Sequence, residues 1–221
     1  MMAAAAQFRP DTIVVLGDFA DFYAVSFHSK DPRRALTLES EVKDVRLGLD
    51  ALDSLGASRK VFVAGNHEHR LERYLCDKAP ALFGLVDVPE LFELKDRDWE
   101  YVPYMDGIDI GKLYVTHDLG KCGKYAIQSA RDDVEGNVVI GHIHRMGLHY
   151  QGNAKGVPKL AAAFGWLGDF DEIGYKHKRT ALKDWTHGFG IGYMNAKGDV
   201  FLQGIPIFDG KCCVEGKIVG S

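Results

Sequence analysis

Four short apolar runs divide the first 140 residues of the chain. They are rich in Val, Ile, Leu or Phe, and they cover residues 12–16, 60–64, 112–116 and 137–140. Continuous apolar runs of this length are typical of strands that are buried on both faces. The pattern therefore predicts four buried strands.

Helical periodicity separates these strands. Between the first two runs, apolar residues recur at spacings of three and four, which places them on one face of a helix. They are Val42, Val45, Leu49 and Leu52. Two further helices are predicted over residues 68–78 and 124–132. The buried side of the first of these two is expected to consist of Leu71, Tyr74 and Leu75. Strands that alternate with helices indicate an α/β fold with parallel strand pairs.

The C-terminal third has a different pattern. Residues 188–195, 200–206 and 211–219 are predicted to form strands joined by short turns. Glycine, asparagine and aspartate in the intervening segments are typical of such turns. The pattern predicts an antiparallel meander that closes the fold. Because the chain has no internal repeat, low-complexity tract or linker, we expect one domain over residues 1–221.

Polar residues that can bind metal ions follow each of the four apolar runs. These groups are GDFAD at residues 17–21, GNHE at 65–68, HD at 117–118 and GHIH at 141–144. In open α/β sheets, ligands bind beyond the carboxyl ends of the strands. We therefore expect the four groups to gather at one edge of the sheet.

This mixture of carboxylate, amide and imidazole groups favours Mn, Fe or Zn over Ca or a metal that prefers thiolates. Two metal ions about 4 Å apart can clamp a phosphate, activate water and stabilise the leaving oxygen. A nearby histidine that is not a ligand can protonate that oxygen. The residues thus indicate metal-assisted hydrolysis of a phosphate ester.

In this order and at this spacing, the four groups resemble the motifs of the calcineurin-like metallophosphoesterase superfamily. The stretches GDFADFY, GNHEHRLERYL and WTHGFG are most similar to its phage-encoded and bacterial branch, and the resemblance extends over about residues 10–219. It implies a four-layer αββα sandwich with mixed sheets. It also implies a hydrolase that cleaves phosphate mono- or diesters at a di-metal centre, with Mn expected and Fe or Zn as alternatives.

The resemblance implies a role for each motif residue. Asp18 corresponds to the carboxylate that bridges both metal ions, and His144 to a ligand of the second ion. The remaining ligands of the first ion correspond to Asn66, His117 and His142.

The catalytic residues are implied in the same way. His67 corresponds to the general acid, and Asp21 to the carboxylate that holds it. Arg70, one turn further along the predicted helix, is expected to reach the substrate phosphate, for which a bidentate donor is suited.

One departure from the family pattern affects these expectations. The family begins with a strand that carries Asp-x-His, and no histidine precedes Asp18 in this chain. The opening MMAAAAQFRPD resembles the tail of the helix that follows that strand, so we expect the first strand to be missing and a sheet edge to be unpaired. The second ion would then keep only Asp18 and His144.

This departure leaves three hypotheses open. The leading one is an active phosphoesterase. The alternative is a catalytically impaired, single-metal or metal-free binding module on the same scaffold. A third is an unrelated α/β protein in which the histidines are structural.

Several other polar residues near the motifs have simpler interpretations. Asp118 is expected to be a turn residue, and His187 to have a packing role. His28 and His69 are weak candidates for replacing lost ligands. The GDFD segment at residues 168–171 is expected to be a loop, and KHKR at 176–179 a solvated loop or, alternatively, a rim that attracts phosphate.

Composition limits the class of protein further. With 46% hydrophobic and 11% aromatic residues the chain is too apolar to be disordered, and it has no apolar run long enough to span a membrane. A net charge of −4 argues against a broad basic surface for nucleic acid, although a nucleotide or a nucleic-acid end remains open as substrate. The oligomeric state also remains open.

The cysteines and the N-terminal residues bear on the compartment. None of the four cysteines forms a C-x-x-C pair, and we expect all of them to be reduced thiols. The first residues lack the features of a signal peptide. Together these observations predict a cytoplasmic protein.

Overall fold

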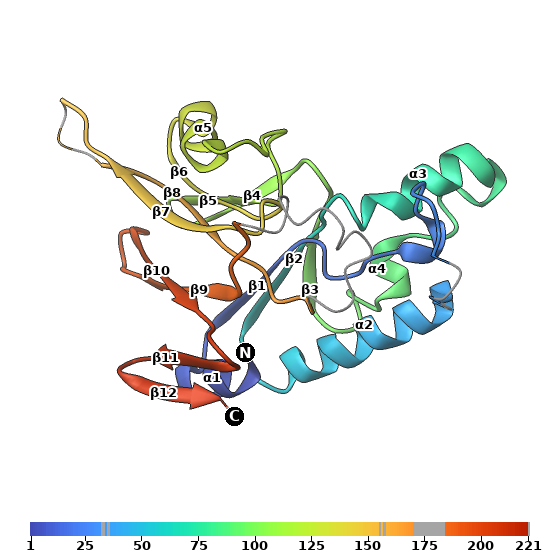
Figure 1. Ribbon diagram of the computed structural model, residues 1–221, viewed down its shortest axis with the longest axis horizontal. Helices are drawn as coiled ribbons and strands as arrows, with labels where there is room; N and C mark the ends of the chain where they lie inside the picture. The colour runs from blue at the N-terminus through green and yellow to red at the C-terminus, as the bar shows by residue number, and fades with distance from the viewer. Residues whose placement is uncertain (32–33, 35, 155, 157, 170–183, 221) are drawn as a thin grey trace. The chain divides into compact units, whose positions relative to one another are not determined.

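The computed structural model describes residues 1–31, 34, 36–154, 156, 158–169 and 184–220 (Figure 1). The chain divides into two compact units. The N-terminal unit comprises Met2 and Arg9–Asp106, and the C-terminal unit comprises Met1, Ala3–Phe8 and Gly107–Ser221. Both contain helices and strands, so the expected α/β class is confirmed, whereas the single domain stays a prediction.

A three-stranded parallel sheet forms the centre of the N-terminal unit. Its strands, in order across the sheet, are β1 (Thr12–Leu16), β2 (Arg59–Val63) and β3 (Trp99–Val102). The first two match the predicted strands at residues 12–16 and 60–64, the second with a shift of one residue. The prediction that both are buried on both faces is wrong for β1, where only Val15 is buried, because β1 lies at the edge of this sheet and has one neighbouring strand.

Helix α2 (Leu38–Asp53) covers one face of this sheet with the apolar residues that its periodicity predicted. Val45, Leu49 and Leu52 are buried, and Val42 packs against the same cluster. The helix begins at Thr37, whose hydroxyl accepts the N–H of Ser40 in a capping box. Aromatic rings fill the core below it, namely Phe22, Phe62, Phe92 and Trp99.

Helix α3 (His69–Lys78) confirms the helix predicted over residues 68–78. Leu71 and Leu75 are buried, but Tyr74 is 37% exposed, so its predicted burial is wrong. Positions 71 and 75 lie one turn apart and define a narrow buried face, and position 74 lies beside it. The remaining short helices of this unit are η1 (Tyr23–Val25), η2 (Pro80–Leu82) and α4 (Val88–Leu91).

Asp53, the last residue of α2, ties the helix to the sheet. Its carboxylate accepts hydrogen bonds from Lys60 Nζ at 2.7 Å, from Trp99 Nε1 at 2.9 Å and from Arg97 Nη1 at 2.9 Å. Burial acts to raise the pKa of Asp53, but these three donors outweigh it and the pKa lies below its usual value of 3.8. The ionised carboxylate therefore stabilises the folded state.

The C-terminal unit is built on a five-stranded mixed sheet. Its strands, in order, are β4 (Gly107–Ile110), β5 (Leu113–Thr116), β6 (Asn137–Ile140), β8 (Lys159–Phe164) and β7 (Met146–Gln151). The three middle strands are parallel, and both outer strands are antiparallel to their neighbours. The predicted strands at residues 112–116 and 137–140 are β5 and β6.

Helix α5 (Ala126–Val134) packs on this sheet through small and branched residues. They are Ala126, Ile127 and Ala130, which contact Val138, Ala161 and Ala163 in one core cluster. The prediction of a helix at 124–132 is confirmed with a shift of two residues toward the C-terminus.

Two antiparallel hairpins follow, formed by β9 (Gly188–Met194) with β10 (Val200–Pro206), and by β11 (Lys211–Val214) with β12 (Lys217–Gly220). The single strand predicted over residues 211–219 is wrong. Glu215 and Gly216 have positive φ angles of 50° and 76°, which is the backbone of a tight two-residue hairpin turn.

The opening residues form helix α1 (Met2–Phe8), as the sequence predicted. Ala4 of this helix is buried with Ile191, Ile205 and Val214 from the hairpins. All four cysteines carry free thiols, as expected. Among the described residues, no helix is both long enough and apolar enough to cross a lipid bilayer.

We expect Asp53→Asn to lower the free energy of unfolding by about 1–3 kcal/mol at neutral pH, because the shared acceptor loses its charge and one of its two accepting oxygens becomes a donor. Since the folded pKa of Asp53 is below the unfolded value, the loss should shrink as the pH falls below about 4 and through the folded pKa. Urea unfolding at several pH values measures it.

Asp50→Asn is the matched control, because Asp50 also accepts from Arg97 but its side chain is 57% exposed. Its effect should stay below about 1 kcal/mol. Equal losses in the two variants would show that the partly buried hydrogen bonds of Asp53 stabilise the protein no more than the exposed ion pair of Asp50 does.

Candidate metal centre

The turn after β1 holds Asp18 in an uncommon backbone conformation. Gly17 and Asp18 both have positive φ angles, 82° and 53°. For a residue with a side chain this left-handed conformation costs about 1–2 kcal/mol. Such strain persists only where neighbouring groups fix it, and it is frequent at functional sites.

Glu68 is the group that fixes this turn. Its fully buried carboxylate accepts the N–H of Asp18 at 2.8 Å and the N–H of Ala20 at 2.8 Å. It also accepts the N–H of Gly65 at 2.7 Å, in the turn after β2. One carboxylate thus joins the ends of two neighbouring strands. Burial raises the pKa of Glu68, the Asp18 carboxylate raises it further, and the three N–H donors oppose the shift.

Sequence reasoning assigned no role to Glu68. The available signal was its position directly before α3, in a motif otherwise made of ligand and acid candidates. A charged residue at such a position is usually solvated, so its burial against three amide groups could be recognised only in the folded chain.

His67 and Asp21 lie together, as the resemblance implied. His67 Nδ1 is 3.0 Å from Asp21 Oδ1, and the His67 N–H donates to Asp18 Oδ1 at 3.0 Å. The other ring nitrogen, Nε2, is 3.9 Å from Asp18 Oδ2. The imidazole is therefore oriented by one carboxylate while its second nitrogen faces another.

Arg70 completes this group. Its Nη1 donates to the main-chain oxygen and to Oδ1 of Asp21, both at 2.7 Å, and its Nη2 is 2.9 Å from His67 Nε2. Burial acts to raise the pKa of Asp21, but the hydrogen bonds and charges of His67 and Arg70 prevail and lower it. Asp21 is thus held as a carboxylate.

Asn66, the amide candidate, begins the turn between β2 and α3 and is half-buried. It is adjacent to Gly65 and His67, whose N–H groups are bound by Glu68 and Asp18. The N-terminal unit therefore brings Asp18, Asp21, His67 and Arg70 together, and Asn66 precedes His67 in the second of the two turns that the Glu68 carboxylate joins.

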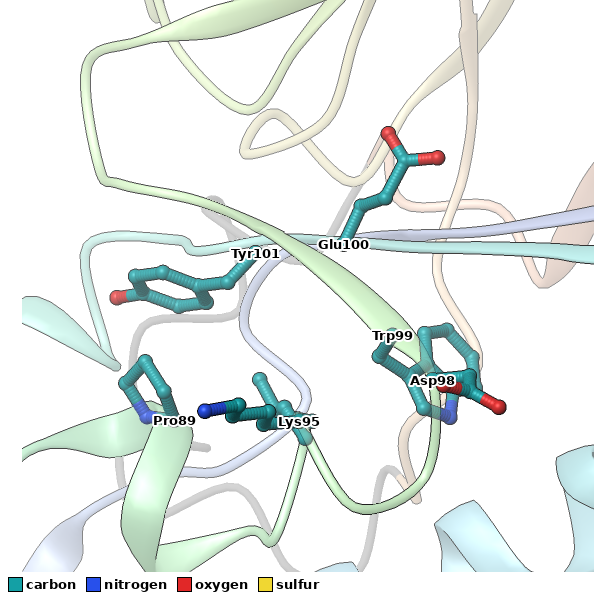
Figure 2. Close-up of a pocket in the computed structure, with 7 residues that line it drawn as sticks. Pro89, Lys95, Asp98, Trp99, Glu100 and Tyr101 are labelled. Atoms are coloured by element: carbon teal, nitrogen blue, oxygen red, sulfur yellow. The ribbon is translucent and has the colours of Figure 1, made fainter.

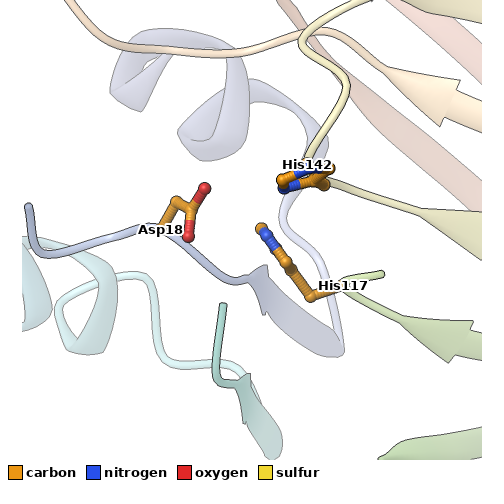
Figure 3. A group of neighbouring side chains, drawn as sticks. All are labelled: Asp18, His117 and His142. Atoms are coloured by element: carbon orange, nitrogen blue, oxygen red, sulfur yellow. The ribbon is translucent and has the colours of Figure 1, made fainter. Parts of the chain in front are cut away.

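His117 and His142 follow β5 and β6, which are adjacent parallel strands of the C-terminal unit. Their ring centroids are 5.4 Å apart with an interplanar angle of 74°, and His117 is 1% exposed. The Gly141 N–H donates to the His117 carbonyl at 2.9 Å, and His142 has a left-handed φ of 57°. Figure 3 shows the rings of His117 and His142 as sticks.

His144 has a different environment. Its ring stacks on Trp166, with centroids 5.6 Å apart, and meets Trp185 edge to face at 4.1 Å. Its φ is 56°, and its carbonyl accepts the Thr186 N–H at 2.9 Å. His187 also contacts Trp166, which fits its predicted packing role. The structure thus places His144 in an aromatic cluster that the sequence did not predict.

The weaker candidates lie elsewhere. Asp118 accepts the Gly120 N–H at 2.7 Å, which confirms it as a turn residue. His69 contacts Glu72 and stacks near Tyr104, and His28 is exposed. Gly168 and Asp169 belong to no helix or strand, as expected for a loop, and the rest of that segment and residues 176–179 lie outside the described residues.

The surface pocket in Figure 2 is separate from these groups. It has a volume of about 360 Å³ and lies in the N-terminal unit beside β3, where Trp99 and Tyr101 line it together with Pro89 and Lys95. None of the predicted site residues lines it. It gives no support to their chemistry.

A scan against protein-family models finds no family that matches the chain, and a search of curated proteins finds no matching relative. The family resemblance of the four motifs therefore stays a prediction.

We expect Glu68→Gln to weaken metal binding about 10- to 100-fold, because an amide nitrogen cannot accept an N–H and the Asp18 turn loses part of its support. The variant should also lose about 1–3 kcal/mol of stability. Calorimetric titration with Mn and urea unfolding measure the two effects.

Glu41→Gln is the control that separates an effect on protein stability from an effect on Mn binding. Glu41 is also buried and accepts two N–H groups, those of Tyr23 and Ala24, away from the Asp18 turn. The Glu41→Gln variant should have a lower free energy of unfolding but an unchanged affinity for Mn. The same loss of affinity in both variants would refute a specific role for Glu68.

Proposed function

We propose that this protein is a metal-dependent hydrolase of phosphate esters with the calcineurin-like four-layer sandwich. The observation that carries the proposal is the arrangement of Asp18, His67 and Asp21. A candidate ligand carboxylate lies 3.9 Å from an imidazole nitrogen whose ring is oriented by a second carboxylate. A metal ligand beside an oriented acid–base histidine is what hydrolysis of an ester needs.

The donor set fits a divalent transition metal. Among the residues that the family resemblance assigns to one ion, Asp18 and Asn66 would supply oxygen atoms, and His117 and His142 would supply imidazole nitrogens. Two rings 5.4 Å apart suit nitrogens that are each about 2.1 Å from one ion. We infer that these four residues hold one ion, with Mn favoured and Fe or Zn as alternatives. When bound, such an ion polarises a phosphoryl oxygen and acidifies water.

His67 performs the proton transfer in this proposal. Asp21 accepts the Nδ1 hydrogen and keeps the ring in place. Because Nε2 accepts from Arg70 Nη2 in this structure, it has to exchange this contact for a proton before it can deliver one to the leaving oxygen. Arg70 contributes positive charge where the phosphoryl group would bind. The roles of all three residues as catalytic groups are part of the proposal.

A second candidate is a single-metal or metal-free binding module on the same scaffold. The aromatic environment of His144, which packs against Trp166 and Trp185, favours this binding module. A second metal site made of Asp18 and His144 alone would be weak. In the active form we therefore expect one tightly bound ion per chain and a second that is weakly held.

The proposal also covers the chemical class of the substrate and the cellular compartment. We infer a small phosphate ester or a nucleotide or nucleic-acid end, since a net charge of −4 does not favour a long nucleic acid. Four free thiols support a reducing, cytoplasmic compartment.

Hydrolysis of aryl phosphate mono- and diesters with added Mn tests the function, with metal content measured by mass spectrometry. Asp18→Ala should lower metal content and activity together. His67→Ala should keep the metal and lower turnover about 10²- to 10⁴-fold.

His69→Ala is the control, because His69 lies two residues away in α3 and binds Glu72 instead. It should leave activity unchanged. Full activity in His67→Ala would disprove the general-acid role, and one bound ion without any turnover would favour the binding module.

A further inference from the structure

A run of consecutive apolar residues lies on the surface of the N-terminal unit, where it joins α3 to α4 (Figure 1). Residues 79–86 read APALFGLV and contain no polar or charged side chain. Leu82, Phe83 and Leu85 are 47%, 53% and 69% exposed. Single exposed apolar side chains are common, but a contiguous exposed run is typical of a surface that another molecule covers. We call residues 79–86 the apolar loop.

Hydrogen bonds and core contacts hold the apolar loop in one shape. Its two ends, Ala79 and Val86, pack against the core cluster of the N-terminal unit. Between them the Leu82 N–H donates to the Ala79 carbonyl at 2.9 Å, and the Leu85 N–H donates to the Leu82 carbonyl at 3.0 Å. The large side chains are thus presented to solvent on a preformed turn, which lowers the entropy lost when a partner binds.

Opposite charges flank the apolar loop. Lys78, the last residue of α3, precedes it, and Asp87 follows it. Asp87 Oδ1 accepts the Glu90 N–H at 2.8 Å, whereas its other oxygen and the Lys78 ammonium have no hydrogen bond or ion pair within the described part of the chain. Asp77 adds a second negative charge beside Lys78. Flanks without an excess of positive charge attract neither an anionic membrane nor nucleic acid, so the charges favour a protein partner.

A second copy of the chain matches this arrangement of charges. In a contact with two-fold symmetry, the same surface occurs on both sides. If two apolar loops meet antiparallel, the beginning of one lies against the end of the other, and Lys78 then faces Asp87 of the partner subunit twice. Three large apolar side chains from each copy form a contact smaller than a standard protein interface, which predicts weak association.

We propose that the apolar loop forms the contact of a weak homodimer, in which two copies of residues 79–86 pack antiparallel about a two-fold axis between reciprocal Lys78–Asp87 ion pairs. This inference does not depend on the proposed function. It explains why an apolar segment is held in a fixed shape at the surface and why its two ends carry opposite charges.

Sedimentation velocity of the full chain at about 1–500 μM tests the dimer, for which we expect a Kd of about 10–100 μM. Phe83→Ser should weaken association at least about 30-fold, because both copies lose a buried ring. The thermal unfolding midpoint should stay unchanged, since Phe83 is exposed in the monomer. Leu47→Ser is the matched control, because Leu47 is 57% exposed on α2 and lies outside the apolar loop. It should leave the Kd unchanged.

A pair of charge variants tests the antiparallel arrangement. Lys78→Glu places a carboxylate against Asp87 of the partner subunit and should weaken the dimer about 3- to 10-fold. Asp87→Asn keeps a side chain that can cap α4. Alone it should weaken the dimer by removing the ion pair, but in the Lys78→Glu background it should strengthen the dimer by removing the repulsion. This change of sign requires that the two side chains face each other.

Three results would overturn the inference. The first is a monomer at every concentration, or a dimer that Phe83→Ser leaves intact. The second is an effect of Asp87→Asn that has the same sign in both backgrounds. The third is binding to vesicles of phosphatidylcholine and phosphatidylserine that Phe83→Ser abolishes, which would assign the apolar loop to a membrane surface instead.

Discussion

The buried carboxylate of Glu68 is the contact on which the candidate site of the N-terminal unit depends. Three backbone N–H groups from two strand-end turns converge on it within 2.8 Å. They include that of Asp18, whose left-handed backbone would be unfavourable in a free chain. The cost of burying a charge is offset here by charge-assisted hydrogen bonds, as buried carboxylates require. In return, Asp18 has a fixed orientation before any ligand binds.

The remaining polar groups of this unit extend the same connection. Asp18 accepts the His67 N–H, His67 contacts Asp21, and Arg70 binds both. In the C-terminal unit the backbone positions the candidate ligands differently, because two adjacent parallel strands place His117 and His142 side by side. Preorganisation of this kind is the main way in which a protein supplies electrostatic stabilisation to a reaction.

The sequence predicted the elements with strong local signals and missed those that tertiary contacts create. The apolar runs predicted β1 and β6 with their correct bounds, and the family resemblance implied the pairing of His67 with Asp21. The turn at Glu215 was missed because only the glycine beside it signals a hairpin. Nothing local marks Glu68 as buried, Arg70 as held by Asp21, or His144 as packed against tryptophans, since each depends on partners distant along the chain.

The central claim is that imidazoles from the ends of β5 and β6 bind a metal ion. Electron spin echo envelope modulation of the protein loaded with one equivalent of Mn tests this most directly, because it detects nitrogen ligands of the ion. The account predicts coupling to two imidazole nitrogens, reduced to one in His142→Ala. Bound Mn without any imidazole coupling, or coupling that is unchanged in His142→Ala, would contradict it.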